Sequence, residues 1–174
     1  AKTISLFRMF AYGAEEPSDL LFQLNEEMVR TAQSGIFVTA AYIIYSAQDR
    51  QVLIASAGHL PTFIVRAKSG DIESVQLEEG MPLGLMERLE FSQKSVTLEE
   101  GDNLVLYTDG VVESKNLKRE DFGEERLKAL LSASRQQNPA EILKVDQEQF
   151  QAIAGKAPQH DDCTMIIPQQ KKSS

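Results

Sequence analysis

Seven consecutive residues decide the fold of this 174-residue chain: Leu104-Val105-Leu106-Tyr107-Thr108-Asp109-Gly110. The first four are apolar on both faces of an extended strand, which is typical of a strand in the centre of a packed sheet. The strand delivers the carboxylate of Asp109 at its end, and Gly110 permits a sharp turn directly after it. This order of residues predicts a charge held rigidly at the rim of a sheet.

A segment near the C-terminus reverses this order: Gln159-His160-Asp161-Asp162-Cys163-Thr164-Met165-Ile166-Ile167. Here two adjacent carboxylates precede an apolar strand. If the two strands are antiparallel neighbours, the end of one lies beside the start of the other, and Asp109 meets Asp161 or Asp162. Carboxylates that lie this close raise each other's proton affinity unless a cation lies between them. Oxygen ligands without a histidine or thiolate partner suit Mg²⁺ or Mn²⁺.

Both segments also have an ordinary structural interpretation. Asp-Gly after a strand is a common turn signal, and Asp-Asp before a strand is common in solvated loops, so the spacing alone favours turns. Each of the two histidines likewise has both a functional and a structural interpretation. His59 is a possible ligand or general acid, but its place at a hairpin corner is typical of a turn residue. His160 stands beside Asp161, where it either contacts phosphate or water or belongs to a loop.

The rest of the chain predicts helices at both ends of a block of mostly antiparallel strands. Helical spacing of apolar residues predicts a helix over 1–14, a second helix with Ser18 as its N-cap, and helices over 124–134 and 139–154. Runs of β-branched and aromatic residues between turn signals predict strands over 36–46, 51–57, 62–67, 72–77, 91–98, 103–108 and 163–167. We therefore predict an α+β fold in which sheet packs between helices.

Composition excludes several classes of function. A net charge of −8 leaves no basic surface for nucleic acid or for an anionic membrane. The single cysteine, Cys163, cannot form an intramolecular disulfide, which fits a reducing compartment and predicts a cytoplasmic location. The most apolar run, Ile36 to Tyr45, is about half as long as a membrane helix requires, so no membrane span is expected.

Several motifs taken together resemble one protein family. The chain is similar to the bacterial serine phosphatases of the sporulation stage II protein E and sigma-factor-regulator type, a branch of the metal-dependent protein phosphatase 2C-like superfamily. The similarity runs from about Ala1 to Pro168. It rests on the order and spacing of Phe37-Val38-Thr39-Ala40-Ala41-Tyr42, Ala57-Gly58-His59-Leu60-Pro61, Met81-Pro82-Leu83-Gly84-Leu85, Leu106-Tyr107-Thr108-Asp109-Gly110-Val111-Val112-Glu113-Ser114, Phe122-Gly123 and Asp161-Asp162-Cys163-Thr164.

This resemblance implies an αββα sandwich of two antiparallel sheets flanked by helices, with two Mn²⁺ or Mg²⁺ ions at one edge of the sheets. It implies dephosphorylation of phosphoserine or phosphothreonine on a bacterial regulatory protein, such as an anti-sigma-factor antagonist. Water activated by the metal ions takes the place of a protein nucleophile. The further partner it implies is an upstream sensor or response-regulator domain, and it leaves homodimer formation open.

The resemblance also assigns residues. Asp109 and Asp161 match the later metal-binding aspartates of the family. Asp162 stands where eukaryotic relatives often have asparagine, so its expected place is behind the metal ligands. Gly110 and His160 are expected beside the ligands or the substrate.

The chain departs from the family in one respect. The first metal ligands of the family lie in a Gly-Asp segment and an Asp-x-x-Gly-His-Gly segment that come before the helix beginning here near Ala1. We therefore expect a phosphatase-like domain over 1–168 that lacks its N-terminal strands, followed by a flexible tail over 169–174. On this hypothesis the intact protein is the active phosphatase and this chain alone is inactive. The alternative hypothesis is a catalytically silent, phosphatase-like binding or signalling module.

Overall fold

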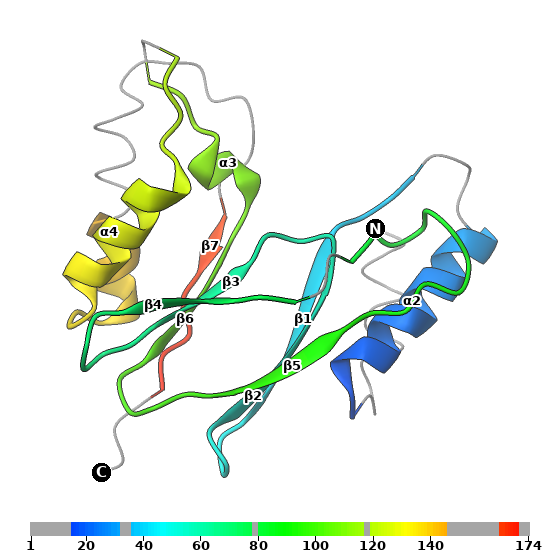
Figure 1. Ribbon diagram of the computed structural model, residues 1–174, viewed down its shortest axis with the longest axis horizontal. Coiled ribbons are helices and arrows are strands. Elements are labelled where there is room, and N and C mark those ends of the chain that lie inside the picture. The colour runs from blue at the N-terminus through cyan, green and yellow to red at the C-terminus, as the bar shows by residue number, and fades with distance from the viewer. Residues whose placement is uncertain (1–14, 32–35, 78–79, 117–118, 146–163, 171–174) are drawn as a thin grey trace. The chain divides into compact units, whose positions relative to one another are not determined.

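A computed structural model of the chain describes residues 15–31, 36–77, 80–116, 119–145 and 164–170 (Figure 1). The chain forms two compact units. Unit 1 comprises residues 1–59 and 76–97, and unit 2 comprises residues 60–75 and 98–174. Each unit is therefore built from two separate stretches of sequence, and the chain passes from one unit to the other three times. The helix predicted over 1–14 lies outside the described residues.

Unit 1 contains one helix and a three-stranded antiparallel sheet. The helix is α2 (Pro17–Thr31), and the strands are β1 (Ala40–Ser46), β2 (Gln51–Ala57) and β5 (Gln93–Thr97), in the order β1-β2-β5. β1 and β2 form the predicted hairpin, in which Ser46 pairs with Gln51 and Ala40 with Ala57. β5 adds to the other edge of β2, with Val52 opposite Val96.

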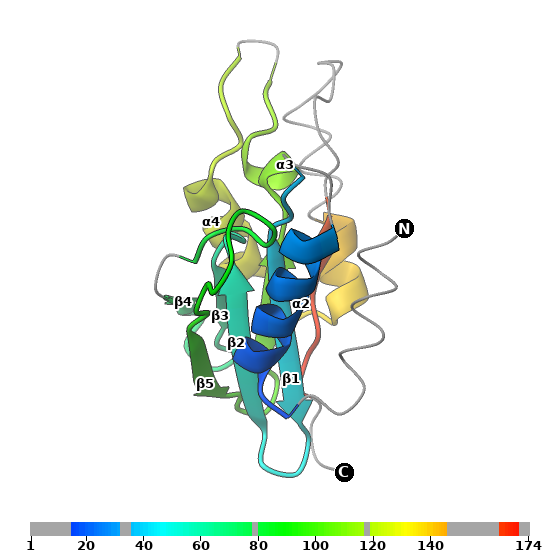
Figure 2. The ribbon, with the colours of Figure 1, turned by 90° about the vertical axis from the view of Figure 1, so that its right-hand side faces the viewer.

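Helix α2 buries its apolar stripe against this sheet. Figure 2 shows the helix lying along β1 and β2. The buried cluster of unit 1 consists of Leu20, Leu21, Leu24, Met28, Ala55, Ala57, Leu83 and Phe91. Full burial of a leucine or methionine side chain stabilises a fold by about 1.5–3 kcal/mol, so the helical stripe supplies much of the stability of unit 1.

The start of α2 differs from the prediction. Pro17 is the first helical residue, a position that suits its fixed φ and its missing N–H. Ser18 therefore lies inside the helix and does not cap it. Its backbone N–H and its hydroxyl donate instead to Oε1 of Gln93 on β5, at 3.1 and 3.0 Å. The serine ties the first turn of the helix to the edge of the sheet.

A buried asparagine fixes the loop that precedes β5. Asn25 lies in the middle of α2, where its Oδ1 accepts the N–H of Gly84 at 3.0 Å and its Nδ2 donates to the carbonyl of Met86 at 2.9 Å. Gly84 has φ +88°, and a Cβ added there would lie 2.9 Å from the carbonyl oxygen of Ile36. Only glycine fits this close approach of two backbone segments.

Unit 2 contains a four-stranded antiparallel sheet and several helices. The strands are β3 (Thr62–Val65), β4 (Ile72–Val75), β6 (Asn103–Tyr107) and β7 (Met165–Ile166), in the order β4-β3-β6-β7. The helices are α3 (Asp109–Val112) and α4 (Glu124–Ser134), and residues 139–145 form the described part of another helix. α4 has the bounds that the sequence predicts. β6 lies between β3 and β7, which confirms that Leu104 to Tyr107 form an interior strand.

The helices cover the sheet of unit 2 with apolar side chains. Its buried cluster consists of Phe63, Val65, Val105, Tyr107, Val111, Phe122, Leu127, Leu131, Ile142 and Ile167. The helix from residue 139 starts with a capping box, since Asn138 Oδ1 accepts the N–H of Glu141 at 3.0 Å and Glu141 Oε2 accepts the N–H of Asn138 at 3.2 Å. Pro139 takes the first helical position, as the sequence predicts.

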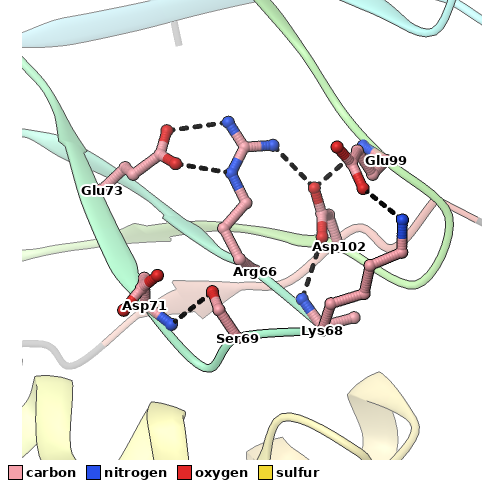
Figure 3. A network of polar contacts seen from close by, with 8 residues as sticks. Arg66, Lys68, Ser69, Asp71, Glu73, Glu99 and Asp102 are labelled. Atoms are coloured by element: carbon pink, nitrogen blue, oxygen red, sulfur yellow. Dashed lines mark hydrogen bonds and ion pairs between the residues drawn. The ribbon is translucent and has the colours of Figure 1, made fainter.

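A chain of charged residues anchors the start of β6 (Figure 3). Asp102 is 1% exposed and accepts hydrogen bonds from Arg66 Nη1 at 2.7 Å, the Ala67 N–H at 2.9 Å and the Glu99 N–H at 2.8 Å. Arg66 also donates through Nε and Nη2 to the carboxylate of Glu73, both at 2.7 Å. This bidentate pair raises the pKa of Arg66 and lowers that of Glu73. The buried carboxylate is thus compensated by a guanidinium and two backbone donors.

Tyr107 ends β6 inside the core. Its side chain is 2% exposed and stacks on Phe63, with 5.1 Å between the ring centroids. Burial, together with the charge of Glu124 and a hydrogen bond to it, raises the pKa of Tyr107 to about 12. Glu124 pairs with Lys128 at 2.5 Å, and the Lys128 ammonium lies 5.3 Å from the centroid of the Phe63 ring. The strand and the first turn of α4 are therefore joined by polar as well as apolar contacts.

The C-terminal segment runs along β6 beyond the two residues of β7. Leu104 donates its N–H to the carbonyl of Pro168 at 2.9 Å, and Gln170 donates to that of Asp102 at 2.9 Å. Gln169 forms a bridge with Asn103. The first two residues of the tail expected over 169–174 are therefore hydrogen-bonded to the sheet. In the described part of the chain no helix is long and apolar enough to cross a membrane.

We predict that Asp102→Asn destabilises the chain by on the order of 3 kcal/mol, because one amide oxygen cannot replace a buried carboxylate that compensates an arginine and two N–H groups. Lys68→Ala, which breaks the exposed pair of Lys68 with Glu99, is the control and leaves stability unchanged. Urea unfolding of both variants is the measurement. Equal midpoints for Asp102→Asn and the unmutated chain would contradict the anchoring role.

We further predict an alkaline loss of stability caused by Tyr107. Because its pKa is raised in the folded chain, its contribution is complete below pH 10 and declines as the pH rises towards 12. Urea unfolding should show a loss of about 1 kcal/mol from this group between pH 9 and pH 11. Tyr107→Phe should lack that part of the loss. Tyr45→Phe, at an exposed tyrosine of β1, should retain it, and equal pH dependence in the two variants would refute the assignment.

Candidate functional site

The carboxylate of Asp109 stands where strand β6 ends and helix α3 begins. Thr108 is still extended, with φ −98° and ψ 161°, and its carbonyl accepts the N–H of Val111 at 3.0 Å. Asp109 is the first helical residue, and its carbonyl accepts the N–H of Glu113 at 2.8 Å. The sharp turn expected at Gly110 is therefore a four-residue helix, in which the glycine does not adopt a positive φ.

Asp109 presents one carboxylate oxygen that has no hydrogen-bond partner in the described part of the chain. The residue is exposed, and its Oδ1 accepts the N–H of the buried Gly110 at 2.8 Å. Among the described residues no hydrogen bond or ion pair reaches Oδ2. Gly110 thus touches the predicted ligand directly and holds its carboxylate in one orientation. An exposed, oriented carboxylate oxygen is a suitable ligand for a hard cation such as Mg²⁺ or Mn²⁺.

Helix α3 is anchored in the buried cluster of unit 2. Val111 is buried in the cluster of unit 2, as is Phe122, which lies after the loop that follows α3. The N–H of Phe122 donates to the carbonyl of Ser114 at 2.7 Å, and the N–H of Gly123 donates to that of Val112 at 2.9 Å. The residues that leave α3 and those that return to it are therefore joined by two backbone hydrogen bonds.

Strand β7 lies antiparallel to β6, as the carboxylate hypothesis requires. Leu106 pairs with Ile166 and Tyr107 with Met165. One residue further on, the N–H of Thr108 donates to the carbonyl of Thr164 at 3.0 Å, and the N–H of Thr164 donates to Oγ1 of Thr108 at 3.0 Å. The end of β6 and the start of β7 are therefore neighbours.

The other predicted site residues fall outside the described part of the chain. His160, Asp161 and Asp162 all lie there, so their approach to Asp109 remains a prediction. Within the described ranges, no three Asp, Glu, His or Cys residues form a group that could hold a metal ion. Cys163, expected to pack as a small apolar residue, also lies outside them.

The backbone of His59 takes part in the turn at its hairpin corner, and its backbone contacts do not decide between a turn residue and a ligand or general acid. Its backbone N–H donates to Oγ of Ser56 at 3.1 Å, and its carbonyl accepts from the same hydroxyl at 3.3 Å. A serine side chain and the histidine backbone thus close the turn that follows β2. Thr108 has no signature in local spacing, because its hydroxyl accepts the N–H of a residue 56 positions away.

Comparison with known proteins gives the relatives of this chain. A family model described as Stage II sporulation protein E (SpoIIE) matches residues 1–170. The chain is 29% identical over 163 residues to the phosphoserine phosphatase RsbU of Bacillus subtilis (strain 168), which covers 89% of this chain and 45% of RsbU. The chain thus spans less than half the length of this curated relative.

Solved structures show the same fold at low sequence identity. The SiaA-PP2C domain of Pseudomonas aeruginosa has a TM-score of 0.82 at 19% identity, covering 96% of this chain and 67% of that domain. The phosphatase domain of SpoIIE from Bacillus subtilis has a TM-score of 0.69 at 19% identity, covering 99% and 74%. These likenesses, with two antiparallel sheets and their helices, confirm the predicted fold class. Because the family model spans nearly all of its residues, the chain belongs to the Stage II sporulation protein E (SpoIIE) family.

Proposed function

We propose that this chain belongs to a metal-dependent phosphatase that removes phosphate from phosphoserine or phosphothreonine on a bacterial regulatory protein. One observation carries the proposal: the exposed carboxylate of Asp109 follows a buried central strand, β6, whose antiparallel neighbour β7 begins at Met165, three residues after Asp162 in the sequence. Membership of the SpoIIE family and similarity to a protein named phosphoserine phosphatase support it. Residues 1–168 form the phosphatase-like domain in this proposal.

Asp109 and Asp161 are the metal ligands that we propose from this chain. The chemistry of Asp109 fits a divalent cation, since the residue is exposed, the Gly110 N–H donates to Oδ1, and Oδ2 has no partner among the described residues. Asp162 is proposed to lie behind Asp161, and His160 is proposed to contact phosphate or water; all three residues lie outside the described part of the chain. The related SpoIIE phosphatase domain was presoaked with Mn, which supports Mn²⁺ or Mg²⁺ as the cofactor.

The residues of this chain would bind and orient rather than attack. When bound, two divalent cations would neutralise charge on the phosphoryl oxygens and lower the pKa of a water molecule, which would favour hydrolysis of the phosphoester. Asp109 contributes a ligand whose backbone is fixed by the end of β6 on one side and by the burial of Val111 on the other. The reaction therefore needs no cysteine or serine nucleophile from this chain.

The substrate and partners follow from the sigma-regulator relatives. A small anti-sigma-factor antagonist carrying phosphoserine is the proposed substrate, and an upstream sensor or response-regulator domain is the proposed source of control. The curated relative RsbU is more than twice as long as its aligned part, which leaves room for such a domain in that protein. The proposed location is the cytoplasm.

We predict that Asp109→Asn in the full-length protein lowers Mn²⁺-dependent phosphate release from a phosphoserine protein by at least about 100-fold, because an amide is a poor ligand for a hard cation. In metal-free buffer its melting temperature should stay unchanged or rise, because one of two repelling carboxylates is removed.

Asp71→Asn provides the matched control, since Asp71 is also an exposed aspartate of unit 2 and lies in the turn between β3 and β4. This variant should retain full activity. If Asp109→Asn keeps most of its activity, Asp109 is not a metal ligand. If the unmutated full-length protein has no Mn²⁺-dependent activity on phosphoserine proteins, the silent signalling module replaces the phosphatase proposal.

A further inference from the structure

We propose that Thr108 is a positioning residue that sets the entry of β7 against Asp109 through its side-chain hydroxyl. The inference rests on the proposed metal site and concerns a residue to which the family resemblance gives no role. Two hydrogen bonds carry it: the N–H of Thr108 donates to the carbonyl of Thr164, and the N–H of Thr164 donates to Oγ1 of Thr108, both at 3.0 Å.

The register shows why a side chain is needed at this position. Along β6, hydrogen-bonded pairs recur at every second residue. Asp102 with Gln170, Leu104 with Pro168 and Thr108 with Thr164 each include a backbone bond between the two partners. In a regular antiparallel pair the Thr164 N–H would donate to the carbonyl of Thr108. That carbonyl instead accepts the N–H of Val111 and starts helix α3.

The hydroxyl therefore replaces a backbone acceptor that the helix has taken. Without it, the Thr164 N–H would lose its partner at the position where the strand pair ends. Threonine serves both needs, since its β-branched side chain favours the extended backbone and its Oγ accepts the hydrogen bond. Thr108 thus lets β6 become a helix without releasing β7.

The pair also links the two proposed ligand segments. Thr108 directly precedes Asp109, and Thr164 follows Asp161 by three residues. Three residues of extended chain span at most about 11 Å, so fixing Thr164 limits how far Asp161 can lie from the end of β6. Loss of the hydroxyl should therefore weaken metal binding, although Thr108 itself is not proposed to touch the metal.

The test compares Thr108→Val, which keeps the shape but removes the acceptor, with Thr108→Ser, which keeps the hydroxyl. In the full-length protein, Mn²⁺ affinity is measured by titration calorimetry, and the exchange of the Thr164 amide is measured by NMR in metal-free buffer. We expect Thr108→Val to weaken Mn²⁺ binding about 10- to 100-fold and to speed the exchange of this amide at least about tenfold. Thr108→Ser should restore both values.

Thr39→Val, at an exposed threonine of unit 1, is the control and should change neither measurement. Thr108→Ala repeats the test with a side chain too small to clash, in case the valine variant does not fold. Unchanged Mn²⁺ affinity or unchanged Thr164 exchange in a folded variant without the hydroxyl would overturn the positioning role. Asp109→Asn measured alongside separates the two proposals, because Mn²⁺ binding that does not depend on Asp109 would refute the metal site itself.

Discussion

Unit 2 depends on the pairing of strand β6 with a neighbour on each edge. β3 and β7 satisfy the backbone of this strand, and residues such as Val105 and Tyr107 are buried between layers of the unit. The strand is also fixed at both ends by side chains, by Asp102 before its first residue and by Thr108 after its last. Because backbone groups in a buried strand must be paired, the position of Asp109 follows from this pairing.

At the start of β6, two adjacent buried side chains differ in how many hydrogen bonds they receive. The Asp102 carboxylate has three donors, whereas the side-chain Oδ1 and Nδ2 of the adjacent Asn103 are buried without a hydrogen-bond partner among the described residues. An unsatisfied neutral amide costs about 1–3 kcal/mol, while an uncompensated buried charge costs far more. The hydrogen bonds therefore go to the Asp102 carboxylate, whose burial without partners would cost more free energy than that of the Asn103 amide.

Periodicity predicts most of the elements and fails where contacts are not local. The α4 bounds and the β1–β2 hairpin follow from apolar spacing and turn residues, which act over a few positions. Helix α3 was missed because Asp109-Gly110 is also a common turn signal. The exposed carboxylate at the end of β6 was predicted, since a strand that is apolar on both faces must end at a rim. The hydroxyl of Thr108 could not be predicted, because its partner is fixed by tertiary pairing.

The return of residues 164–170 to β6 has a consequence for biosynthesis. The Thr108–Thr164 contact joins positions 56 residues apart, so the ribosome must complete this later segment before β6 can gain its second neighbour. Until then the nascent chain carries an apolar strand with one open edge, a state prone to association with other chains. Contacts of such long sequence separation also slow folding. Codon choice and chaperone access while residues 108 to 164 are synthesised should therefore influence the yield of folded protein. They should have little influence on the stability of the finished fold.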